Sequence, residues 1–64
     1  MDEDTRELAN LLCTRIGMLM EDLSERALTV AGTAQNELET RLEEIQQGAL
    51  QITALIGAAQ ALFR

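Results

Sequence analysis

Few side chains in this 64-residue sequence could do chemistry: one thiol, Cys13, and several neighbouring carboxylates. Glu43 and Glu44 could act as an acid–base pair only if they converged, and adjacent residues of a helix point about 100° apart. His, Tyr and Lys are absent, and so are a glycine-rich phosphate loop and a paired-cysteine motif. The sequence therefore predicts a protein that is not an enzyme, holds no metal and needs no cofactor.

Cys13 directly follows Leu12, so the spacing predicts a small, partly buried hydrophobe and a reduced thiol. The opening run, from Asp2 to Asp4, is acidic, whereas a secretory signal peptide begins with cationic residues. The expected location is therefore the cytoplasm.

The charge balance restricts the choice of partner. Eleven acidic residues against five arginines give a formal net charge of −6. Such a chain repels nucleic-acid phosphate and anionic lipid, and it attracts a basic protein. The arginines are scattered from Arg6 to Arg64 and form no basic face.

Apolar residues repeat at alternating spacings of four and three in both halves of the chain, which is typical of helices with a buried seam. In the second half this predicted seam contains Leu38, Leu42, Ile45, Ala49, Ile52, Ile56, Ala59 and Phe63. In the first half it contains Leu12, Ile16, Leu19 and Leu23, within a stripe wide enough to touch two neighbouring helices.

The two seams differ in phase, and the change falls at Gly32. A hairpin turn would produce such a change, because glycine can adopt the left-handed conformation that ends a helix. The competing architecture is one continuous helix of about 90 Å. Asp2 or Asp4 could cap the first helix, and Thr33 or Asn36 the second. Two favourable helical ion pairs are also expected, Asp22 with Arg26 and Glu37 with Arg41.

The second helix carries another stripe, roughly opposite its seam, made of Leu50, Ala54, Gly57 and Ala61. Small residues at this spacing allow another helix backbone to approach closely. A helix that is apolar on two faces usually lies between neighbours.

These patterns predict an all-α fold: one antiparallel hairpin domain over residues 1–64, with helices at about 4–31 and 34–63 and a turn at 32–33. Two helices of this size cannot close a core, so we expect self-association into a four-helix bundle or a larger helical oligomer. The predicted function is a protein–protein interaction module, a small regulatory or assembly adaptor whose partner is itself and, in addition, another protein.

Two alternatives remain open. In helix number and chain length the hairpin resembles the Rop-type regulators of plasmid copy number, a resemblance that implies a dimeric four-helix bundle binding paired RNA hairpins. The stretch Ile45 to Phe63 has 19 uncharged residues, which approaches the length of a membrane span. Its glutamines, Gln46, Gln47, Gln51 and Gln60, would be costly in hydrocarbon.

Overall fold

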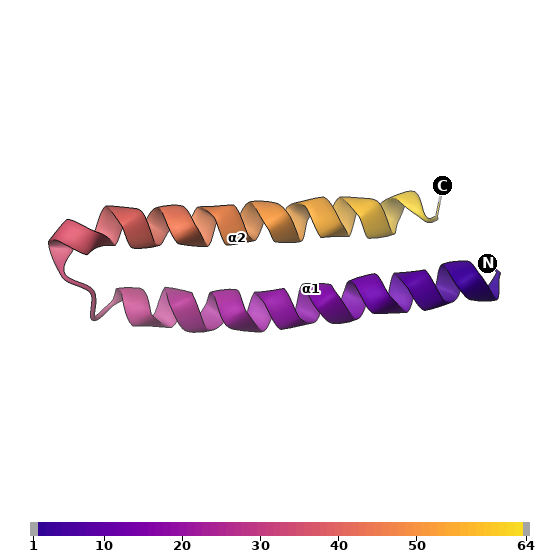
Figure 1. The fold of residues 1–64 in the computed structure, drawn as a ribbon, viewed down its shortest axis with the longest axis horizontal. Helices are drawn as coiled ribbons and strands as arrows, with labels where there is room; N and C mark the ends of the chain where they lie inside the picture. The colour runs from indigo at the N-terminus through magenta and orange to yellow at the C-terminus, as the bar shows by residue number, and fades with distance from the viewer. Residues whose placement is uncertain (1, 64) are drawn as a thin grey trace.

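The computed structural model describes residues 2–63 and shows two antiparallel helices, α1 (Glu3–Val30) and α2 (Gln35–Ala61). The helices lie side by side, and the start of α1 and the end of α2 lie at the end opposite the turn (Figure 1). The molecule measures 50 × 16 × 10 Å. The predicted hairpin is confirmed, and the continuous helix is excluded.

The start of α1 is capped by Asp2, one of the two candidate caps in the sequence. Its Oδ1 accepts a hydrogen bond of 2.7 Å from the backbone N–H of Thr5. Glu3 and Asp4 follow in the first turn, where negative charge is favourable at the positive end of the helix dipole.

The turn between the helices differs from the prediction in its details. Gly32 lies in it but does not take the left-handed conformation, because its N–H donates to the carbonyl of Thr29 at 3.2 Å and continues the helical winding. Thr33 does not cap α2, because its hydroxyl donates backward to the carbonyl of Thr29 at 3.1 Å. Asn36 lies inside α2, whose capping residue is Ala34, so α2 begins without a side-chain cap.

The hairpin buries little. Among residues 2–63 only Ala9, Ile52 and Ala59 are buried, and no large side chain is fully enclosed. The two helices therefore form a single layer, each covering one side of the other.

Candidate functional site

The residues where the helices face each other form what we call the hairpin seam. Leu12, Ile16, Leu19 and Leu23 of the predicted seam are half-buried there. From α2, Leu38 and Ile45 are half-buried, and Ile52 and Ala59 are buried. Ala9 joins them from α1 and is one of the three most buried residues.

The other predicted seam residues of α2 are exposed in the hairpin. Leu42 is 51% exposed, Ile56 38% and Phe63 64%, and Ala49 is also exposed. One position earlier along the helix, the half-buried Gly48, Leu55 and Leu62 complete the hairpin seam instead. The hairpin alone therefore does not enclose Leu42, Ala49, Ile56 and Phe63, and their place in a core or oligomer seam stays a prediction.

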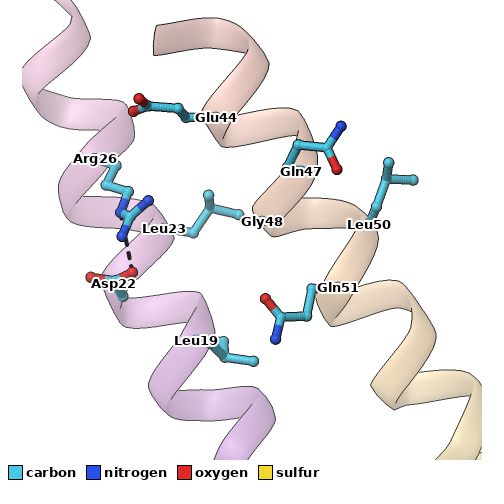
Figure 2. Close-up of a pocket in the computed structure, with 9 residues that line it drawn as sticks. All are labelled: Leu19, Asp22, Leu23, Arg26, Glu44, Gln47, Gly48, Leu50 and Gln51. Carbon is cyan, nitrogen blue, oxygen red and sulfur yellow. Dashed lines mark ion pairs between the residues drawn. The ribbon is translucent and has the colours of Figure 1, made fainter. Parts of the chain in front are cut away.

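Gly48 is a contact residue that sequence analysis missed. A Cβ atom built on Gly48 would lie 2.8 Å from Cδ1 of Leu23, closer than real Cβ contacts allow. Figure 2 shows Leu23 pointing across from α1 to this position. The absence of a side chain at Gly48 therefore makes the space that Leu23 fills. The signal in the sequence was a glycine four residues before Ile52, within an otherwise apolar pattern.

On one side of the hairpin seam the groove between the helices is polar, and we call it the polar flank. It is lined by Asp22, Arg26, Glu44, Gln47 and Gln51 together with Leu19, Leu23, Gly48 and Leu50 (Figure 2). The predicted pair of Arg26 with Asp22 is confirmed, with Nε 3.2 Å from Oδ2. Arg41 forms its ion pair with Glu44 at 3.4 Å instead of with Glu37. These pairs are more than 40% exposed and contribute little to stability.

On the other side of the hairpin seam the groove is uncharged. Its lining residues are Met20, Leu23, Ser24, Ala27, Ile45, Ala49, Ile52 and Thr53. The hydroxyl of Thr53 is already satisfied, because it donates to the carbonyl of Ala49 at 2.9 Å. This groove can therefore be covered by an apolar surface with few hydrogen bonds left unmade.

We call this side the apolar flank, and it continues along both helices at intervals of seven residues, which return to the same face of a helix. Its exposed members are Cys13, Met20 and Ala27 of α1, Leu42, Ala49 and Ile56 of α2, and Phe63, which follows the end of α2. The expectation that Cys13 is partly buried is wrong: its thiol is exposed. The reason is that Cys13 lies one position beyond Leu12, on the apolar flank outside the hairpin seam.

The predicted second face of α2 is exposed in the hairpin, and its member Leu50 also borders the polar flank. Leu50 is 55% exposed, and Ala54, Gly57 and Ala61 are also exposed. A Cβ atom on Gly57 would meet no described atom within 4 Å. The role of this face as an interaction surface stays a prediction.

The titration of Asp2 follows from its position at the start of α1. Backbone and side-chain hydrogen bonds from Thr5 lower the pKa of Asp2 below its usual 3.8, which reflects its role as a helix cap. Within residues 2–63 no three His, Cys, Asp or Glu side chains gather as a metal site. Over the same residues, neither helix has a stretch long and apolar enough to cross a lipid bilayer.

Comparison with known proteins gives no relative: no protein-family model, curated protein or solved structure matches the chain. Any function assigned to the chain therefore depends on the hairpin itself.

Proposed function

We propose that this protein is a non-enzymatic interaction module that self-associates, with two hairpins pairing through their apolar flanks into a four-helix bundle. The observation that carries the proposal is the uncharged groove between the helices, continued by exposed Leu42, Ile56 and Phe63. Isolated apolar side chains on a surface are ordinary, but a continuous strip along both helices is typical of an interaction site.

Covering the apolar flank with another apolar surface would be energetically favourable. Burying one Leu or Ile side chain contributes about 1.5 to 3 kcal/mol, which exceeds the contribution of an exposed ion pair several-fold. Because the hairpin alone encloses no large side chain, covering the apolar flank would add stabilisation that the two helices do not supply to each other. In a helical bundle each helix contacts two neighbours, and the half-buried Ile45 and buried Ile52 already lie between the hairpin seam and this flank.

The regulatory or assembly role is the second part of the proposal. After two apolar flanks have paired, the second face would still be exposed, because Gly57 is open to solvent and Leu50 borders the polar flank instead of the apolar one. Such a surface supports a larger assembly or the binding of another protein to the bundle.

Sedimentation equilibrium tests self-association. The parent protein should have about twice its 7.0 kDa chain mass, and Ile56→Asp should shift the mass toward the single chain, because a charge would be buried without a partner. Leu28→Asp is the matched control, since Leu28 is 76% exposed and lies on the outer side of α1. It should retain the mass of the dimer.

A second variant, Ala49→Glu, places a charge in the middle of the same groove and guards against an effect peculiar to Ile56. The proposal is wrong if the parent protein is helical and has the mass of one chain at every concentration up to the millimolar range.

A further inference from the structure

The charges of the hairpin are distributed unevenly along its length. The half nearer the turn contains Arg26 and Arg41 against seven carboxylates: Glu21, Asp22, Glu25, Glu37, Glu39, Glu43 and Glu44. Counted along the sequence, the remaining residues, which include both ends of the chain, have three arginines, Arg6, Arg15 and Arg64, against four carboxylates: Asp2, Glu3, Asp4 and Glu7. The formal charges of the halves, −5 and −1, sum to the −6 of the whole chain.

Two hairpins can cover each other's apolar flanks in two ways, with their turns at the same end or at opposite ends. Both arrangements bury the same side chains, so apolar burial does not choose between them. With both turns at one end, two halves of charge −5 would be adjacent. With the turns at opposite ends, each half of charge −5 lies beside one of charge −1.

We propose that the occupant of the apolar flank is a second copy of this chain whose turn lies at the opposite end of the bundle. This inference depends on the proposed self-association and adds its orientation. Like charges repel each other when they lie within about 10 Å, which is the Debye length at ordinary salt concentrations. The arrangement with the turns at opposite ends therefore has less repulsion between the two copies and is the more stable.

The apolar flank has the shape that this arrangement requires. Its members in the second half of the chain run from Leu42 to Phe63 and those on α1 from Cys13 to Ala27. Its centre therefore lies near Met20 and Ile52, which both line the groove. A twofold axis at this centre places the flank of one copy over the flank of the other. The apolar flank is part of a face of 50 × 16 Å, whose projected area of roughly 800 Å² is comparable to the area per partner in a standard protein interface.

Distances between spin labels test the orientation. The label is placed by Gln35→Cys in a Cys13→Ser background, because Gln35 is exposed, uncharged and close to the turn. Gln35 lies 17 residues from Ile52, so opposed turns separate the two labels by roughly 50 Å at 1.5 Å per residue. Turns at the same end would bring them within about 25 Å.

A charge variant tests the cause. Replacing Glu37, Glu39 and Glu43 by Gln leaves the turn half with a formal charge of −2, so a short-distance population should appear beside the long one. The matched control replaces Glu3 and Glu7 by Gln in the other half and should retain the long distance alone.

The outcomes separate the two proposals. The mass of a single chain by sedimentation overturns self-association and the orientation with it. The mass of a dimer with only the short distance overturns the orientation and leaves self-association standing. If the long distance persists alone after Glu37, Glu39 and Glu43 are all replaced by Gln, charge is overturned as the cause.

Discussion

At the scale of single residues, the contact of Leu23 with Gly48 determines how the helices meet. Glycine weakens a helix because it costs more backbone entropy than other residues do. Here the absence of a side chain at Gly48 allows Leu23 of α1 to approach the backbone of α2. The Cδ1 atom of Leu23 lies 2.8 Å from the position that a Cβ atom on Gly48 would occupy. Gly57, in contrast, is open to solvent and gains no such contact.

The two glycines give a matched test of this contact. Gly57→Ala should raise the free energy of unfolding by about 1 kcal/mol through helix propensity alone. Gly48→Ala has the same propensity gain but displaces Leu23 from its preferred rotamer, so its gain should be smaller by about 1 kcal/mol. Urea unfolding at one protein concentration measures both values, and equal gains would show that the contact is unimportant.

Asp2 gives a prediction about pH. Hydrogen bonds from Thr5 lower the pKa of Asp2 in the folded chain below the usual 3.8, so the carboxylate stabilises α1 above that pH. The stabilisation is lost as the pH falls through the lowered value. A carboxyl carbon titration by NMR should therefore have its midpoint for Asp2 below 3.8; a midpoint at 3.8 or higher would refute the cap. Asp2→Asn should keep the cap and abolish its dependence on pH.

At the scale of the helices, the hydrophobic pattern predicted two helices and the hairpin, but at three positions in the second half of the chain the half-buried residue lies one position earlier than predicted. Ile45, Ile52 and Ala59 belong to both the predicted seam and the observed hairpin seam. An apolar or small residue lies both three and four positions after each of them. Both choices exist each time, in the pairs Gly48 and Ala49, Leu55 and Ile56, and Leu62 and Phe63. Periodicity cannot separate them.

The deciding information is spatial. A count of apolar residues favours Ala49 over Gly48, whereas the packing of Leu23 requires the position without a side chain. The same limit explains the turn: residue type alone identifies Gly32 and Thr33 as residues that can end or start a helix. Which carbonyl their N–H and hydroxyl groups reach depends on the path of the backbone.

The start of α2 gives a prediction for the element. Its capping residue, Ala34, has the extended backbone that a cap requires (φ −62°, ψ 146°) but no side-chain oxygen. Ala34→Ser should supply that acceptor and raise the free energy of unfolding by about 1 kcal/mol. Ala31→Ser, at the end of α1, should give no comparable gain in thermal or urea unfolding. Equal effects of the two substitutions would contradict the assignment of the cap.

At the scale of the whole molecule, the hairpin is long and thin, so the proposed self-association would also stabilise its fold. Few residues are enclosed by the two helices, and covering the apolar flank would stabilise folded over unfolded chains. The melting temperature should accordingly depend on protein concentration.

Salt gives a prediction for the assembly. Two copies with a net charge of −6 each repel one another, and added salt screens this repulsion. The proposed interface is apolar, so salt should not weaken the hydrophobic contacts that hold it together. Raising sodium chloride from about 20 to 300 mM should lower the dissociation constant several-fold, as measured by sedimentation equilibrium. Weaker association at high salt would indicate an interface held by ion pairs. A chain with Glu37, Glu39 and Glu43 replaced by Gln should respond less.

The contact between Leu23 and Gly48 also fixes the axial register of the hairpin. If α1 slid along α2 by two helical turns, Leu23 would meet Arg41 in one direction or Leu55 in the other, and both have large side chains. The apolar repeat itself would tolerate such a slip, since it recurs every seven residues. One missing side chain thus gives a repetitive pair of helices a single alignment.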